Sequence, residues 1–236
     1  PSLAQAIGTV PLIVKSKAIP TAIEFMEREV IMDAEQFLGQ SFPDNQADAY
    51  LLLKFDGDTA EDIAKAYDGV AQICLEQGAC DVLIADTDER ADAIWKTRGS
   101  FLQAINGSTT QMDEVDACVP RSKVNEFVEF VHALQEEMHI RIKSFGHAGD
   151  GNLHVYILRD DLDEDEWHRV LEATMEKMYA KARAMEGQVS GEHGIGFAKK
   201  SYLKESLDPA AVAVMQGIKK AFDPNNILNP HKVCFD

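Results

Sequence analysis

Two short apolar segments, residues 141–146 and 153–158, limit most strongly what this chain can fold into. Both have the composition of β-strands, and the segment between them is too short to hold a helix. Because parallel neighbours need a crossover of about a dozen residues or more, these two strands must pair antiparallel. The dipeptide Asp150-Gly151 between them is typical of a two-residue type I′ turn, which needs positive φ at both positions.

That turn predicts which side chains face each other. Gly149 should lie opposite Asn152, and His147 opposite His154. Alternation along the strands predicts one apolar face, consisting of Ile142, Leu153, Val155 and Ile157, and a second face with Lys143, Phe145, His147, His154 and Tyr156. Cross-strand partners have Cβ atoms about 5 Å apart, so two imidazoles can reach one ion. The alternative is a hairpin whose histidines only cap a loop.

The rest of the chain alternates short β-rich runs with longer helical patterns. Strands are expected at residues 12–14, 50–55, 82–85 and 117–119, and helices at 59–77, 87–105, 122–138, 165–185, 197–207 and 210–222. We therefore predict an α+β fold with an antiparallel-rich sheet and helices on one face, arranged as two ferredoxin-like β-α-β units flanking residue 120. No repeat or low-complexity linker divides residues 1–236, which are expected to form one domain.

The charge of the chain restricts its partners. With a net charge of −17 over 236 residues, it lacks the clustered Lys and Arg that a nucleic-acid surface needs. A small anionic substrate would be repelled by this field, so its site would need a local cation. The four cysteines, Cys74, Cys80, Cys118 and Cys234, show neither a C-x-x-C motif nor a disulfide framework, which predicts reduced thiols and a cytoplasmic protein. No apolar run is long enough to span a membrane.

A second glycine-rich segment, residues 190–196, carries an acid next to an imidazole. Three glycines surround Glu192 and His193, so the backbone can turn sharply and present both side chains. On an extended backbone the two would point to opposite sides, unless the turn reorients one of them. Two histidines and one carboxylate are a common ligand set for a divalent ion, with a further imidazole free to act as a base. The alternative is that Glu192 only satisfies backbone N–H groups at a helix start.

Three segments in this order and spacing, residues 145–154, 190–196 and 222–230, resemble the C-terminal domain of the FAD-linked oxidases. That family includes D-lactate dehydrogenase, the glycolate oxidase flavoprotein subunit and D-2-hydroxyglutarate dehydrogenase. The resemblance implies that His147, His154 and Glu192 hold a divalent metal, Zn²⁺ first, with Fe²⁺ or Mn²⁺ as alternatives. It implies that His193 removes the hydroxyl proton of the substrate and that Arg98 binds its carboxylate.

The family reaction is oxidation of a D-2-hydroxy acid to the 2-oxo acid, with hydride passing to FAD. The resemblance implies cofactor contacts from Asn152 and Asn229, and a flavin-binding domain before Pro1, so this chain is expected to be inactive alone. It departs from the family at His231, where a glycine is usual, and residues 112–117 hold no lysine, which favours lactate or glycolate over a dicarboxylate. The expected partners are the substrate, the flavin domain, an electron acceptor that could bring the protein to a membrane, and a second copy in a homodimer. The rival interpretations are a stand-alone metal-binding or regulatory module and a metallohydrolase.

Overall fold

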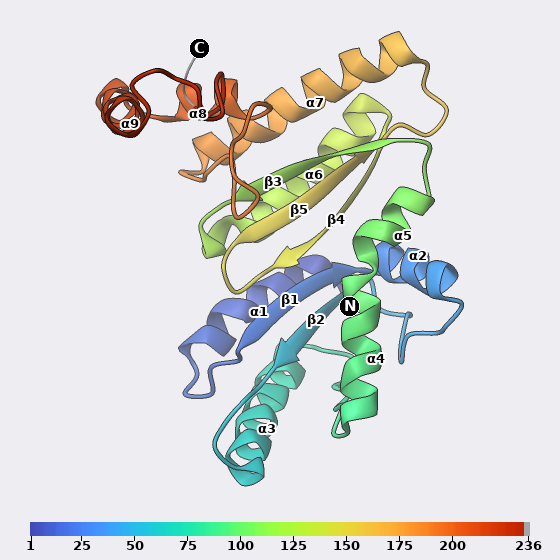
Figure 1. Cartoon of the computed structure of the whole chain (residues 1–236). Helices are drawn as coiled ribbons and strands as arrows, with labels where there is room; N and C mark the ends of the chain where they lie inside the picture. Colours follow the sequence, from blue (N-terminus) through green and yellow to red (C-terminus); the bar gives the residue numbers. More distant parts are fainter. Residues whose placement is uncertain (234–236) are drawn as a thin grey trace.

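The computed structural model describes residues 1–233 and is built on one five-stranded sheet (Figure 1). The strand order is β2-β1-β4-β5-β3, and all neighbouring strands are antiparallel. The strands are β1 (Ala22–Glu27), β2 (Ala49–Lys54), β3 (Met112–Cys118), β4 (Arg141–His147) and β5 (Asn152–Leu158). The antiparallel α+β architecture is therefore confirmed. The segment β3–α6–β4 is a β-α-β unit with β5 between its strands, whereas the strands of β1–α2–β2 pair with each other directly.

The helices lie before, between and after these strands along the chain (Figure 1). They are α1 (Leu3–Lys15), α2 (Arg28–Leu38), α3 (Ala60–Glu76), α4 (Asp88–Gly99), α5 (Phe101–Gly107), a 3₁₀ turn (Arg121–Lys123), α6 (Val124–Met138), α7 (Glu164–Ala184), α8 (Lys200–Ser206) and α9 (Pro209–Phe222). Side chains cap several of them. Thr59 accepts a hydrogen bond from the N–H of Asp62 at the start of α3, and Asp163 does the same for Glu166 in α7.

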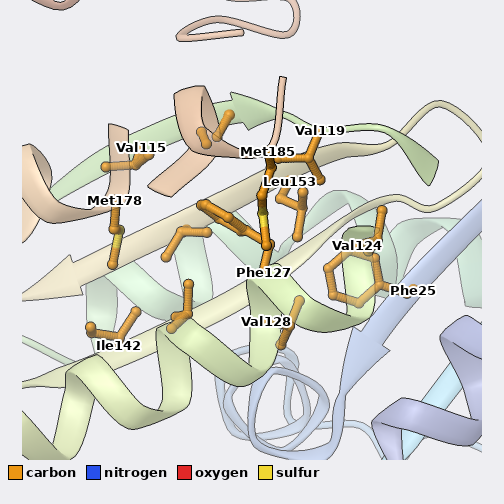
Figure 2. Packing of buried hydrophobic residues seen from close by; sticks show 14 of the residues in the cluster. Phe25, Val115, Val119, Val124, Phe127, Val128, Ile142, Leu153, Met178 and Met185 are labelled. Atoms are coloured by element: carbon orange, nitrogen blue, oxygen red, sulfur yellow. The ribbon is translucent and has the colours of Figure 1, made fainter. Parts of the chain in front are cut away.

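The main hydrophobic core lies between the sheet and the helices α1, α3, α6 and α7, which cover one face as expected. Figure 2 shows Phe127 and Val128 of α6 below Leu153 of β5, and Met178 of α7 near Val115 of β3 in the same core. The four apolar residues predicted to share one face of the hairpin all belong to this core: Ile142, Leu153, Val155 and Ile157. A smaller cluster lies on the opposite face, where α2 and α5 pack on Phe145 and Tyr156. That second face is only partly covered by helices, so polar side chains can gather there.

Two predicted strands are wrong. Residues 12–14 belong to α1, where Ile7, Val10 and Ile13 are buried at the three-residue spacing of one helix face. The prediction failed because residues 12–14 are a short apolar run, whose periodicity cannot distinguish a helix from a strand. Pro11, which lies inside the helix, also argued against a helix in the sequence. Residues 82–85 are not a strand, because no neighbouring strand pairs with them and Leu83 and Ile84 remain exposed.

Other boundaries also differ from the prediction. The helix expected at 87–105 is two helices, because α4 ends at Gly99 and Ser100 separates it from α5. The elements β1, α1 and α2 were not predicted, although β1 is a central strand between β2 and β4. Residues 141–146 and 153–158 are confirmed as the antiparallel pair β4 and β5.

The predicted register of the hairpin is wrong by two residues. His147 lies opposite Asn152, and Phe145 lies opposite His154. The loop is longer than a two-residue turn, because neighbouring segments bind it: the Gly149 N–H donates to the Ile23 carbonyl at 3.2 Å, and the Gly151 carbonyl accepts from the Val119 N–H at 2.9 Å. A shift of two residues keeps each side chain on its face, so the predicted faces are confirmed although the partners are not.

Two further observations concern the chain as a whole. None of the helices in residues 1–233 combines the length and the apolar character that crossing a membrane requires. Cys74, Cys80 and Cys118 are free thiols, as predicted, whereas Cys234 lies outside the described residues.

Candidate active site and metal centre

Two imidazoles and one carboxylate meet on the partly covered face of the sheet. His147 is the last residue of β4, and His154 lies near the start of β5. Their Nε2 atoms are 3.3 Å apart, and the Oε1 atom of Glu192 lies 3.3 Å from the first and 3.1 Å from the second. The structure thus brings together the three residues predicted as metal ligands.

The spacing of these three atoms fits a shared cation. Donors at ~2.0–2.1 Å from a tetrahedral Zn²⁺ lie about 3.3–3.4 Å from one another. The other ring nitrogen of each histidine contacts a carboxylate, at 2.7 Å for His147 Nδ1 to Glu24 and 3.0 Å for His154 Nδ1 to Glu114. These contacts favour a proton on each Nδ1, which leaves both Nε2 lone pairs aimed at one point. The donor set therefore suits a divalent metal with an N₂O ligand set and open positions.

Glu24 joins this donor set to the predicted substrate arginine. Its Oε2 accepts hydrogen bonds from Nε and Nη2 of Arg98 at 3.0 and 2.6 Å, while its Oε1 faces His147. Burial alone would raise the pKa of Glu24, but His147 and Arg98 outweigh it and hold this pKa below its usual value. In turn, the hydrogen bond to Glu24 raises the pKa of His147. The ionised carboxylate thus makes the His147 imidazole a more basic ligand.

The Arg98 guanidinium lies on the same face as the histidines. Its central carbon is 4.5 Å from the ring centroid of Phe145, and the Phe145 ring is 5.4 Å from that of His154. Two of its nitrogens are occupied by Glu24, whereas Nη1 has no hydrogen-bond partner among residues 1–233. Arg98 is therefore close to the donor set and retains donor capacity for a further anion.

Glu114 of β3 connects the second half of the site. Its Oε1 accepts hydrogen bonds from His154 Nδ1 and from the Tyr156 hydroxyl, both at 3.0 Å, and its Oε2 lies 3.5 Å from His193 Nδ1. Burial and the nearby Glu114 charge raise the pKa of Tyr156, so its hydroxyl stays protonated and donates. One carboxylate thereby contacts both a histidine predicted to bind the metal and the predicted base.

The segment 190–196 brings Glu192 and His193 to the same side of the sheet. While Glu192 reaches the two Nε2 atoms, the His193 ring stacks on His154 with a centroid distance of 5.1 Å and an interplanar angle of 23°. The segment turns instead of running as an extended strand, so adjacent side chains converge on the site. Their side chains are 50% and 43% exposed, so this side of the donor set is open to a substrate.

The two asparagines predicted as cofactor contacts occupy different positions. Asn152 is buried at the start of β5, its Oδ1 has no hydrogen-bond partner among the described residues, and it packs against Gly191. Asn229 lies in the exposed segment after α9, where its side chain accepts a hydrogen bond from Lys232 Nζ at 3.0 Å. Within residues 1–233, no hydrogen bond joins Asn229 to the histidine cluster.

Sequence reasoning missed the carboxylates Glu24 and Glu114. The local signal for them is weak, because Met26 follows Phe25 directly and the acids Asp113 and Glu114 are adjacent, so neither segment has a clean period-two alternation.

Known proteins resemble the whole chain. The family model described as FAD linked oxidases, C-terminal domain, matches residues 1–233. A D-lactate dehydrogenase from Anaerostipes hadrus is 45% identical over 99% of this chain and 50% of its own length. The glycolate oxidase subunit GlcD of Bacillus subtilis is 36% identical over 97% of this chain and 48% of its own length. The chain thus spans about half the length of these relatives.

A solved structure shares the fold. The structure of p-cresol methylhydroxylase with bound substrate aligns with all of this chain and 51% of its own chain, with a TM-score of 0.70 at 12% sequence identity. This likeness shows the fold alone. The match of the family model over residues 1–233 and the 45% identity to a D-lactate dehydrogenase show that the chain belongs to the family of C-terminal domains of FAD-linked oxidases.

Proposed function

We propose that this chain is the substrate-binding and metal-binding half of an FAD-dependent dehydrogenase that oxidises a D-2-hydroxy acid to the 2-oxo acid. The observation that carries the proposal is the convergence of His147 Nε2, His154 Nε2 and Glu192 Oε1 at 3.1–3.3 Å beside Arg98. The relatives named D-lactate dehydrogenase and glycolate oxidase subunit support this reaction class.

In this proposal the metal site binds the substrate hydroxyl, and His193 accepts its proton. A bound divalent ion, Zn²⁺ or alternatively Fe²⁺ or Mn²⁺, would make the substrate hydroxyl more acidic, and FAD would accept the hydride. His193 accepts the hydroxyl proton, because its imidazole lies beside the metal ligands without being needed among them. Glu114 lies 3.5 Å from His193 Nδ1, so its carboxylate can hold the orientation of the ring beside the metal ligands.

The charges around the site favour a small monocarboxylate. Arg98 offers Nη1 to the substrate carboxylate, while Glu24, Glu114 and Glu192 surround it with negative charge. The nearby Lys199 is already bound to Asp116. A second carboxylate on the substrate would thus meet acids instead of a cation, which favours the D-lactate and glycolate class over dicarboxylates.

The flavin would be held mainly by a further domain, as the half-length match to the relatives supports. In this proposal the isoalloxazine approaches the open side of the donor set, where Glu192 and His193 are exposed. Asn152 and Asn229 are the proposed contacts from this chain to the cofactor. A separate electron acceptor would then reoxidise the flavin.

A metal-binding experiment tests the proposal on this chain. Chelator-treated protein is dialysed against Zn²⁺, washed, and its metal content measured, with His168→Ala as a control in an exposed histidine of α7. One equivalent is expected in the wild type and the control, and almost none in His154→Ala. Equal contents in all three would contradict the metal site.

A second measurement separates the rival functions. The chain is joined to its flavin half, and flavin bleaching by D-lactate, L-lactate and glycolate is followed without oxygen. Bleaching by a D-2-hydroxy acid or glycolate, lost in His154→Ala, is the expected result. Metal binding without bleaching would favour a binding module, and ester or amide turnover without flavin would favour a metallohydrolase.

A further inference from the structure

A buried carboxylate under the site has no role in the function proposed above. Asp116 of β3 is 0% exposed and lies opposite His154 in the β3–β5 register. One of its oxygens, Oδ2, accepts hydrogen bonds from five donors of a single segment. These are Ser190 Oγ at 2.8 Å, the N–H groups of Gly191, Glu192 and His193 at 3.1, 3.2 and 3.0 Å, and Lys199 Nζ at 3.3 Å.

This arrangement is an anion-binding nest whose anion belongs to the protein itself. Three successive backbone N–H groups that converge on one oxygen form a concave site for negative charge. Burying a carboxylate without hydrogen-bond partners costs several kcal/mol of folding free energy. The five donors offset this cost, and they reach Asp116 because the loop has this conformation. The other oxygen of Asp116, Oδ1, is buried and has no hydrogen-bond partner among the described residues. The segment 190–199 therefore supplies all the donors that this carboxylate has within residues 1–233.

The donors belong to the residues that complete the metal and base positions. Glu192 and His193 both give their N–H groups to Asp116 while their side chains reach the site. Gly191 lies so close to β5 that an added Cβ would be 2.0 Å from Asn152 Oδ1. The segment is thus held to the sheet through its backbone, while Glu192 and His193 are themselves largely exposed.

We propose that Asp116 is a positioning residue that templates the backbone of residues 190–193 and so sets where Glu192 and His193 lie relative to His147 and His154. The proposal rests on the proposed function for its consequence, but its structural content can be tested without metal or substrate. Asn at this position would keep one acceptor oxygen but remove the charge that faces Lys199 and the three backbone N–H groups, and it would put an NH₂ group where the buried Oδ1 already lacks a partner.

The first test measures amide hydrogen exchange by NMR on the metal-free chain. In Asp116→Asn, exchange at Gly191, Glu192 and His193 should accelerate at least about tenfold, while β5 amides such as Val155 keep wild-type rates. Asp113→Asn is the matched control, an exposed acid on the same strand that should change none of them. Unchanged rates at the three loop amides would overturn the proposal.

A milder variant covers the case in which Asp116→Asn loses the fold. Ser190→Ala removes one donor to Asp116, and it also removes the Oγ that accepts the Gly194 N–H at 2.9 Å. It keeps the carboxylate, so it should accelerate exchange at the same loop amides to a smaller degree. Exchange at wild-type rates in the loop amides of Ser190→Ala would contradict the proposed role of Asp116.

The second test asks whether Asp116 affects metal binding by positioning Glu192. The affinity for Co²⁺, measured by chelator competition and read from its visible absorption, should fall about 10- to 100-fold in Asp116→Asn. In a Glu192→Gln background the same substitution should change it less than about threefold, because the ligand that Asp116 positions is already gone. An equal loss in both backgrounds would overturn the assigned route. If the wild type bound no Co²⁺, the proposed function would fail, and the exchange experiment would still decide the role of Asp116.

Discussion

Glu114→Gln is the substitution that most directly tests whether the histidines are held ready for a metal. Glu114 accepts a hydrogen bond from His154 Nδ1 at 3.0 Å and lies 3.5 Å from His193 Nδ1. Glu114→Gln keeps an acceptor oxygen for His154 Nδ1 but loses the negative charge that makes His154 a stronger ligand. Glu114→Ala loses both the acceptor oxygen and the charge.

The magnitude follows from how such outer carboxylates act. Their removal typically lowers metal affinity by about 10- to 100-fold, or about 1.4–2.8 kcal/mol. Because Glu114 is 23% exposed and the amide can still accept, Glu114→Gln should lie near tenfold and Glu114→Ala near a hundredfold. The assay is the dissociation constant for Zn²⁺, measured by competition with a chelator of known affinity.

Tyr156→Phe is the matched control for this prediction. It removes the 3.0 Å hydrogen bond from Tyr156 to Glu114 while leaving the contact between Glu114 and His154 in place. Its affinity for Zn²⁺ should stay within about threefold of the wild type. A wild-type affinity in Glu114→Ala, or a loss in Tyr156→Phe as large as in Glu114→Gln, would refute the reasoning.

Three further predictions concern the base, the core and the pH dependence of stability. In the flavin-containing protein, His193→Asn should keep metal and FAD but lower kcat by about 10²–10⁴, whereas Arg98→Lys should chiefly raise KM; a kcat loss under about tenfold in the first would exclude the base role. Phe127→Ala, at a fully buried position, should lower the free energy of unfolding by about 3–5 kcal/mol in urea titrations. A hydrogen bond to Glu27 raises the pKa of His132, so its contribution to stability is present below about pH 6.5 and lost as pH rises through that raised value. The stability difference between wild type and His132→Ala should therefore shrink from pH 6 to pH 9, and a constant difference would contradict it.

The sequence alone determined those features that depend on local pattern. The alternation in residues 141–158 sorted the hairpin side chains onto two faces, and this held because a register error of two residues does not exchange faces. The glycines around Glu192 and His193 allowed the backbone to turn and marked the segment as a site. The helix predicted at residues 59–77 is confirmed as α3, whose start depends on local residues because Thr59 caps it from within one turn.

Tertiary structure alone decided the features that depend on distant partners. The hairpin loop has its length because Ile23 and Val119, far apart in the chain, bind its backbone. Residues 82–85 remain outside the sheet because a strand needs a neighbour, which no local pattern supplies. The site depends on such partners most of all: Glu24, Glu114 and Asp116 come from β1 and β3, and only the order of strands in the sheet brings them to the histidines of β4 and β5. Hydrogen bonds and charges act over a few ångströms of space irrespective of separation along the chain, so their partners are set by the fold.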